Sequence, residues 1–529
     1  MPSGDPPGGG APAGPGEAGG LSRAARKGLA WTALQSWGVQ VLSLLMFLFL
    51  ARLLEPRAFG LVALTTVFLQ IAQIAVDQGL SAAIIQREKV EPEHLDAAFW
   101  IGMAVAAAFT AGTIAAAPAI AMLFGEPAIT PILRVLSFLF IAGALSGVHE
   151  ALLVRGMRFR VVALRSLAAT AISGVVGVSM AFAGFGVMAL VAQDLAFAAV
   201  SVVVLWTASG WRPRFAFSAR HYRELVGFSG GILGLRVMNF LTRRSDDLLI
   251  GRFLGPVALG YYSVAYKVFK VFLDMFTKIV SRVALPTLSR VQRDPEALRG
   301  ALRGFLRLSA LAAFPVFVGV AATAPDVVQV LFGPRWAASA QVMRVLAVVG
   351  VAQALSLVLQ QGIVAMGRPS WTFAILTATT GLTVAGFALV VDQGIVAVAA
   401  VYALVNWLTL PAYALLLRRL VGLRLADLVA PIRAPVAGCL TMLGAIWLVR
   451  QAASGLPPAP LLLALATAAA AAYALTVLCL DPALPGDVRA LLRRGAGRGR
   501  SGLPAGAGMR PPPPGAAAAY PALGPEAAP

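Results

Sequence analysis

The chain has 529 residues, of which 59% are hydrophobic and only 12% are charged, and its formal net charge is +20. A soluble globular domain carries roughly 25% charged residues, so this composition excludes that class. Apolar runs of about 20 residues recur along the chain and predict an all-α polytopic membrane protein. The arginines gather in short loops between these runs, which indicates contact with lipid head groups rather than with nucleic acid.

No residue pattern indicates a metal site, a cofactor or an enzymatic reaction. Cys439 and Cys479 both lie in late apolar runs and provide no disulfide framework. His94, His149 and His221 are scattered and do not have the spacing of metal ligands. Since the chain also has no phosphate-binding loop and no nucleotide motif, direct use of ATP is not expected.

The apolar runs divide the chain into about 14 spans by the length criterion. The predicted ranges of the spans are 30–54, 58–85, 98–123, 131–154, 162–183, 186–207, 226–254, 257–285, 305–332, 341–366, 370–391, 394–417, 432–449 and 460–480. The predicted organisation is a disordered tail (1–20), an N-lobe of spans 1–6 (21–211), a C-lobe of spans 7–12 (212–424), spans 13–14 (425–482) and a basic, Pro/Gly/Ala-rich disordered tail (483–529). Basic residues alternate between rich and poor loops, which predicts that both termini are cytoplasmic.

An internal repeat links the two predicted lobes. The sequence RLLEPRAFG at Arg52–Gly60 recurs as RFLGPVALG at Arg252–Gly260. Later pairs follow in the same order, such as Leu123-Phe124-Gly125 and Leu331-Phe332-Gly333. We therefore predict that spans 1–6 are duplicated as spans 7–12. Because an even number of spans is duplicated, the two bundles are parallel and the cargo site is expected between them.

Charged residues follow one face of spans 7 and 8, which are joined by a turn at Gly255-Pro256. Arg243 and Lys267 are each about 18 Å from this turn at 1.5 Å per residue, near the middle of the membrane. A cation there costs at least ~2.5–3.5 kcal/mol if it meets lipid, so the charged faces should line an interior. One interpretation is a set of structural ion pairs, and the other is a cationic cavity that binds an anionic cargo. The residues predicted to bind cargo are Arg236, Asn239, Arg243, Arg244, Asp247, Lys267, Lys270 and Asp274.

A gate is predicted at the cytoplasmic ends of the second and eighth spans. The offset between the repeats aligns Asp77 with Lys278, within a residue or two. Positions related by the predicted twofold axis face each other across the cavity, and these two side chains have opposite charges. We expect them to form a contact between the lobes that opens to admit cargo, although pairing of each residue within its own lobe is the alternative.

Two other sets of residues allow more than one interpretation. Tyr261, Tyr262 and Tyr266 could contact sugar or belong to an interfacial aromatic belt. Asp194, in the sixth span, could form an ion pair or lie at the interface.

Three segments resemble the polysaccharide transporters of the multidrug/oligosaccharidyl-lipid/polysaccharide (MOP) exporter superfamily, in particular the Wzx-type and colanic-acid exporters. These segments are LARLLEPRAFGLVAL at Leu50–Leu64, DQGLSAAIIQRE at Asp77–Glu88 and DDLLIGRFLGPVALGYYSVAYKV at Asp246–Val268. The resemblance implies a V-shaped, MATE-like fold of two lobes that alternate between inward-open and outward-open forms. It also implies flipping of undecaprenyl-pyrophosphate-linked oligosaccharide across the bacterial inner membrane, for lipopolysaccharide or exopolysaccharide biosynthesis. Lipid II flippases share this fold and also have two extra C-terminal helices.

The implied partners are membrane lipid and a polyprenyl-pyrophosphate-linked glycan, with an ion gradient and the polysaccharide biosynthesis machinery as further candidates. A cation-coupled drug exporter of the same superfamily is an alternative, but the surplus of cations over anions in spans 7 and 8 disfavours a cationic cargo. A membrane glycan polymerase is a second alternative. It is disfavoured because the predicted outer loops are too short to form an active site.

Overall fold

The computed structural model describes residues 15–77, 80–87, 90–215, 240, 244–453 and 455–481, and the regular elements in these ranges are all helices. Among the described residues, 11 helices are long and apolar enough to cross a membrane. The chain is therefore an all-α, multi-pass membrane protein, as its composition predicts. The count of 14 spans stays a prediction. The seventh span falls largely outside the described residues, and the helices at the second and eighth spans, Pro56–Asp77 and Gly255–Arg290, are not among the 11.

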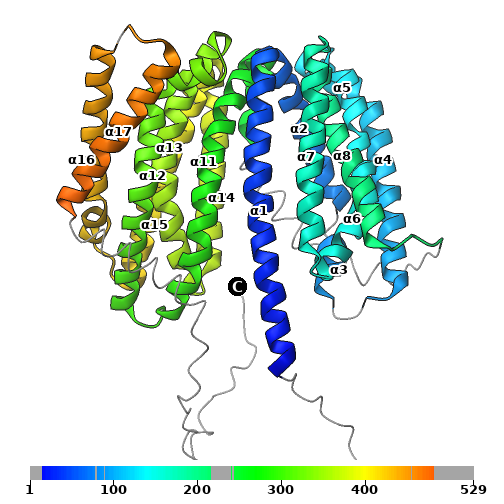
Figure 1. Ribbon diagram of the computed structural model, residues 1–529, viewed down its shortest axis with the longest axis horizontal. Coiled ribbons are helices and arrows are strands. Elements are labelled where there is room, and N and C mark those ends of the chain that lie inside the picture. Colours follow the sequence, from blue (N-terminus) through cyan, green and yellow to red (C-terminus); the bar gives the residue numbers. More distant parts are fainter. Residues whose placement is uncertain are drawn as a thin grey trace, which may run out of the picture.

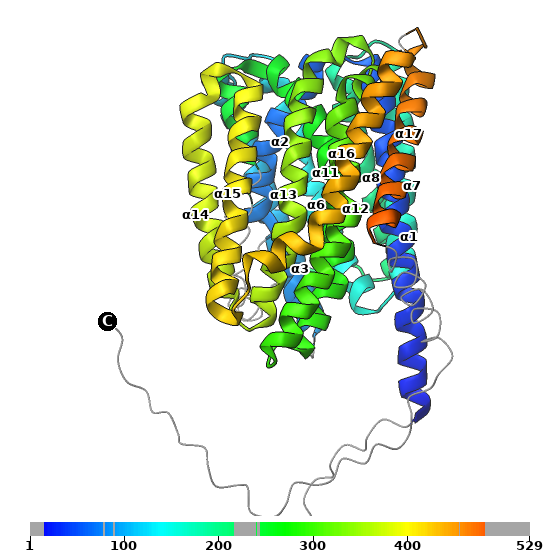
Figure 2. The ribbon, with the colours of Figure 1, turned by 90° about the vertical axis from the view of Figure 1, so that its left-hand side faces the viewer.

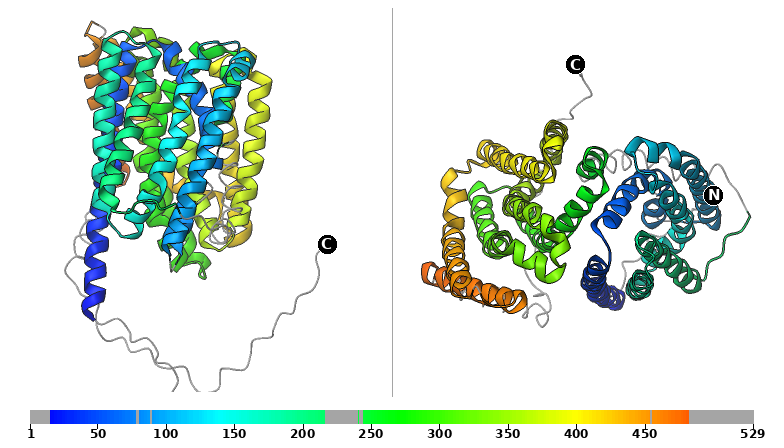
Figure 3. Two further views of the ribbon diagram at one scale, coloured as in Figure 1. Left: turned by 90° about the vertical axis from the view of Figure 1, so that its right-hand side faces the viewer. Right: turned by 90° about the horizontal axis from the view of Figure 1, so that it is seen from above.

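The helices form two groups that lie side by side (Figure 1). The N-lobe consists of α1 (Pro15–Leu53), α2 (Pro56–Asp77), α3 (Leu80–Gln86), α4 (Pro92–Phe124), α5 (Ile129–Leu136), α6 (Phe138–Arg155), α7 (Phe159–Phe182) and α8 (Val187–Ser209). The C-lobe consists of residues 244–253, α11 (Gly255–Arg290), α12 (Pro295–Leu331), η1 (Pro334–Trp336), α13 (Ala337–Ala365), α14 (Pro369–Val390), η2 (Val391–Gln393) and α15 (Ile395–Val421). Viewed from above, α11 is the C-lobe helix that reaches toward the N-lobe, where it packs against α2 (Figure 3).

Two further helices, α16 (Leu425–Ala452) and α17 (Pro458–Leu480), follow the C-lobe. Both pack against α12 (Figure 2), on the side of the C-lobe that faces away from the N-lobe. The Tyr473 hydroxyl donates a hydrogen bond to the Leu311 carbonyl (3.0 Å), and Arg450 forms an ion pair with Asp326. These bonds attach the pair of helices to the C-lobe and leave the face between the lobes to other elements.

The two ends of the helix bundle are distinguished by the helix termini and turns that lie there. Helix α1 starts at the lower end in Figure 1, which we call the terminal end, and α17 runs from the upper end toward it. The turn between α1 and α2 lies at the opposite end, which we call the α1–α2 end, and α11 also begins there. The last described helix thus runs toward the end at which the first one starts, which agrees with an even number of spans.

Matching sequence motifs occupy matching positions in the two lobes. Helices α4 and α12 begin at Pro92 and Pro295, and each ends before a glycine with positive φ, Gly125 (66°) and Gly333 (94°). Glycine adopts this conformation without the steric cost of a Cβ, so it can terminate both helices at the same point. These boundaries support the predicted duplication of spans 1–6.

Three predicted boundaries differ from the structure. The fourth span is split into α5 and α6 at Ser137, whose hydroxyl donates to the Arg134 carbonyl (2.7 Å) while its own carbonyl accepts from Thr110 (3.2 Å). A serine that bonds back to the preceding turn commonly bends a helix. The second predicted span contains two helices, α2 and α3. Helix α1 begins at Pro15, inside the segment predicted to be disordered, because the residues that follow are mostly good helix formers such as Ala, Leu and Arg.

Candidate functional site

The two lobes meet directly at the α1–α2 end. The Trp336 indole N–H donates to the Ala51 carbonyl (2.7 Å), and the Arg52 Nε donates to the Leu331 carbonyl (3.0 Å). The Phe59 and Trp336 rings pack edge to face with centroids 5.4 Å apart. Each of these contacts joins the N-lobe to the C-lobe, so the space between the lobes is closed at this end.

Deeper between the lobes lies a group of polar and charged residues, which we call the inter-lobe cluster. Its members are Phe47, Gln70 and Asp194 of the N-lobe and Arg244, Asp247, Lys267, Lys270 and Asp274 of the C-lobe. Lys267, Lys270 and Asp274 lie together because they recur at helical spacing on the charged face of α11 that the sequence predicts. The other faces of α11 carry buried apolar residues such as Val264, Val268 and Phe269, whose packing fixes the orientation of the helix.

Lys267 is the central cation of this cluster. Its Nζ lies 5.8 Å from the centre of the Phe47 ring on α1, an arrangement in which a cation is attracted to the ring face. It is also within electrostatic range of Asp194 on α8 and of Arg244. Although both lie well inside their helices, the side chains of Lys267 and Asp194 are exposed. They therefore face the space between the lobes rather than a packed core.

Four members of the cluster form two ion pairs within the C-lobe. Arg244 pairs with Asp247 (2.6 Å) and also donates through Nε to Gln70 of the N-lobe (3.0 Å). Lys270 pairs with Asp274 (3.1 Å). These four residues thus form ion pairs with each other, and their predicted binding of cargo stays a prediction. Across the described ranges, Lys267, Lys278 and Arg282 are within 4 Å of no carboxylate oxygen, so none of these three cations on α11 forms an ion pair there.

A pocket of about 240 Å³ continues from the cluster along α1 and α11. Its polar lining comes from Ser36 and Gln40 on α1 and from Asp274, Lys278 and Arg282 on α11. Trp37 adds an aromatic side chain that is 48% exposed. The pocket thus combines two cations, a carboxylate, hydrogen-bonding groups and an aromatic ring.

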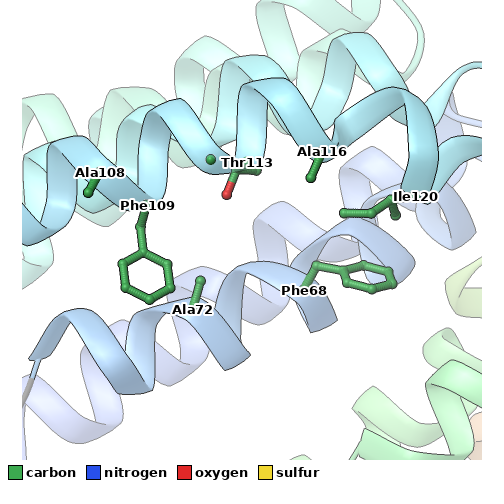
Figure 4. A pocket seen from close by; sticks show the side chains of 8 residues that line it. Phe68, Ala72, Ala108, Phe109, Thr113, Ala116 and Ile120 are labelled. Atoms are coloured by element: carbon green, nitrogen blue, oxygen red, sulfur yellow. The ribbon is translucent and has the colours of Figure 1, made fainter.

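A larger pocket of about 420 Å³ has different chemistry. It lies between α2 and α4 and is lined by Phe68, Ala72, Phe109, Ile120 and neighbouring small residues (Figure 4). Thr113 provides the polar atom seen in this lining (Figure 4). An anion would lose its hydration there and gain no charged partner, so the smaller pocket fits an anionic cargo better.

The remaining predicted residues have varied positions. Arg236, Asn239 and Arg243 lie outside the described residues. Helix α2 ends at Asp77, but the side chain of this residue also lies outside the described part, so the contact with Lys278 stays a prediction.

The prediction that Tyr262 could contact sugar is wrong. The Tyr262 side chain is 0% exposed, and its hydroxyl donates to Asp246 (2.9 Å). It faces the interior of the C-lobe because α11 is rotated so that its charged residues face the N-lobe.

The sequence predicts cargo binding for none of five N-lobe residues at the site, and it leaves Asp194 as an ion-pair or interfacial residue. Gln70 and Asp194 contact the cluster from α2 and α8, and Ser36, Trp37 and Gln40 line the pocket from α1. The available signal was weak: Ser36 and Gln40 are polar residues four positions apart in an apolar helix, and so share a face.

The sequence and the fold are similar to those of known proteins. A model of the family described as "Polysaccharide biosynthesis protein" matches residues 49–341. The chain is 31% identical over 321 residues to the succinoglycan biosynthesis transport protein ExoT of Rhizobium meliloti, an alignment that covers 61% of this chain and 65% of ExoT. It is 24% identical over 396 residues to the teichuronic acid biosynthesis protein TuaB of Bacillus subtilis, which covers 73% of this chain and 80% of TuaB.

Two solved structures share the fold. The lipid II flippase MurJ in an inward closed conformation superposes with a TM-score of 0.70 at 13% identity, covering 85% of this chain and 99% of MurJ. An inward-facing MATE-family transporter of the MOP superfamily superposes with a TM-score of 0.57 at 15% identity, covering 73% of this chain and 95% of that one. The fold is thus the two-lobed MATE-like fold that the sequence predicts. Because the family model matches more than half of its length, the chain belongs to the family of polysaccharide biosynthesis proteins.

Proposed function

We propose that this protein flips a lipid-linked oligosaccharide across the bacterial inner membrane by alternating access to a cationic site between its lobes. The observation that carries the proposal is the set of cations on α11, Lys267, Lys278 and Arg282, which no described carboxylate oxygen approaches within 4 Å and which lie on the side of α11 toward the N-lobe. Placing cations inside a membrane span is costly, so their retention favours an anionic ligand. The similarity to ExoT, whose name describes transport in succinoglycan biosynthesis, supports a glycan cargo.

The cargo chemistry follows from the residues. A pyrophosphate group has several negative oxygens, which lysine binds as a point charge and arginine as a planar fork. Trp37 and Gln40 lie on the opposite wall of the pocket, where an aromatic face and an amide suit sugar. The polyprenyl chain is apolar and remains in lipid. The site thus binds the head group and leaves its bonds unchanged.

Transport in liposomes tests the proposal. The full-length protein is reconstituted with a fluorescent undecaprenyl-pyrophosphate oligosaccharide, and a membrane-impermeant reagent measures the fraction of the glycolipid in the outer leaflet. We expect flipping well above that in protein-free vesicles and no uptake of a cationic dye in a parallel assay. Uptake of the dye without flipping of the glycolipid would favour the drug-exporter alternative.

We also propose that both termini are cytoplasmic, because the basic residues concentrate in the loops on that side. Reporter fusions at Gly125, Gly184 and Asp392 should read periplasmic, and fusions at Arg160 and Arg214 should read cytoplasmic. An inverted signal at any two of these positions would contradict the topology.

The Asp77–Lys278 contact remains part of the proposal. Lys278 is exposed in the pocket between α1 and α11, so it is free to meet an anion. Lys278→Asp should impair flipping, and the double variant Asp77→Lys/Lys278→Asp should restore part of it. The swap will not restore flipping if each residue pairs within its own lobe, and equal inactivity of single and double variants that are folded and inserted would show this.

A further inference from the structure

Helices α2 and α11 approach each other most closely through two glycines at the α1–α2 end. A Cβ added to Gly60 on α2 would overlap the carbonyl of Pro256 on α11 and lie 3.0 Å from the Gly260 nitrogen. A Cβ added to Gly260 would overlap the carbonyl of Pro56 on α2 in the same way. The two helices are thus in contact backbone to backbone, with no room for a side chain at either glycine.

The contact is made twice with the same residue types. Pro56 and Pro256 each stand in the first turn of their helix, and Gly60 and Gly260 each lie four residues further on. Each glycine packs on the proline that begins the other helix. The two proline–glycine patches at this crossing are therefore related by an approximate local twofold axis.

Bulky side chains surround this crossing. Leu64 of α2 is fully buried, and its side chain packs on Gly251 of the C-lobe. Phe47 and Phe332 lie 6.0 Å apart, edge to face, and Trp336 is 0% exposed. These side chains belong to, or pack against, a single core cluster that both lobes share. Because they come from both lobes, they fill the volume beside the crossing only while the two backbones are in contact.

We infer that Gly60 and Gly260 form a seal between the lobes, and that the protein opens the space between the lobes at this end by separating these two glycines. The carbonyls opposite the glycines belong to helical backbone, so they cannot move away as a flexible side chain could. A methyl group at either position would therefore raise the energy of the closed form and leave the separated form unaffected. By population shift alone, such a variant would favour the form that is open at the α1–α2 end.

Labelling of a buried cysteine tests this inference. The reporter is Leu64→Cys in a background in which Cys439 and Cys479 are replaced by alanine, with the protein in lipid nanodiscs so that both membrane faces are accessible. We expect Gly60→Ala and Gly260→Ala each to raise the rate of labelling by a hydrophilic maleimide about tenfold, which corresponds to about 1.4 kcal/mol in the opening equilibrium. The matched controls are Gly112→Ala and Gly319→Ala, since an added Cβ at either helical glycine would meet no atom within 4 Å.

A milder variant keeps the test decisive if the glycine variants do not fold. Trp336→Phe keeps an aromatic ring but removes the N–H that bonds to the Ala51 carbonyl, and it should raise the labelling rate about fivefold. Labelling at the parent rate in folded Gly60→Ala and Gly260→Ala proteins, or in Trp336→Phe if those do not fold, would overturn the inference. The opening role rests on the proposed alternating access, but the labelling readout needs no cargo. Failure of the glycolipid assay alone would thus leave the seal intact.

Discussion

Replacement of Lys267 by glutamine will reduce flipping of the lipid-linked oligosaccharide by about 10- to 100-fold, since a hydrogen bond to a charged group contributes about 1.5–3 kcal/mol. Lys267 is exposed between the lobes, and no described carboxylate lies within 4 Å of it. Glutamine has a similar length, so the change removes the charge without opening a large cavity. The measurement is the initial rate of flipping in liposomes at matched protein density.

Two variants distinguish cargo binding by Lys267 from neutralisation of Asp194. If Lys267 only balances the charge of Asp194, the double variant Lys267→Gln/Asp194→Asn should recover the rate, whereas cargo binding predicts that it stays slow. Arg418→Gln serves as the matched control, because Arg418 is an exposed cation in the last turn of α15. An equal loss in the control variant would show that the effect is not specific to the inter-lobe cluster.

Breaking the Arg244–Asp247 pair will destabilise the fold more than it affects cargo binding. Asp247 is 8% exposed and Arg244 is 30% exposed, and the two side chains are 2.6 Å apart. Arg244→Gln leaves a buried carboxylate without its cation, so we expect a loss of about 3 kcal/mol in the free energy of unfolding. That value is at the low end of the range for broken buried pairs because Arg244 is partly exposed. The measurement is the unfolding transition of the purified protein in detergent.

The double variant Arg244→Gln/Asp247→Asn isolates the pair itself. Since it removes both charges, it should recover most of the lost stability, and the coupling energy follows from the cycle of four proteins. Additive losses in the two single variants would mean that Arg244 does not stabilise Asp247. Such a result would return Arg244 to the set of cations available to cargo.

The charges of α11 could be predicted from sequence because they depend on helical spacing alone. Lys267, Lys270 and Asp274 recur on one face of a helix that otherwise reads as a membrane span, and the structure places that face toward the N-lobe. The same reasoning could not decide which cations are neutralised. Arg244 pairs with Asp247 one turn away, whereas Lys267 has no such partner in the described part of the chain.

Residues contributed by the other lobe could not be predicted from sequence. Asp194 and Gln70 stand in helices with no charged stripe of their own, and only the packing of the lobes brings them to Lys267 and Arg244. Tyr262 illustrates the same difficulty, because a residue expected at the surface is buried by the packing of its helix. Its position in the sequence fits an interfacial aromatic belt, but the rotation of α11 buries it against Asp246.

The crossing of α2 and α11 is an isologous contact within a single chain: each helix supplies the same patch, a proline carbonyl and a glycine, and receives the same patch in return. A contact of this kind is self-complementary, so a six-helix unit that carried only one copy could form it with a second copy of itself. After the predicted duplication, each patch is encoded in its own half of the chain. The two patches must still fit each other. A substitution at Gly60 is therefore constrained by the backbone at Pro256, and one at Gly260 by the backbone at Pro56. The backbone contact thus couples a change in one lobe to the matching position in the other, at the point where the two lobes touch.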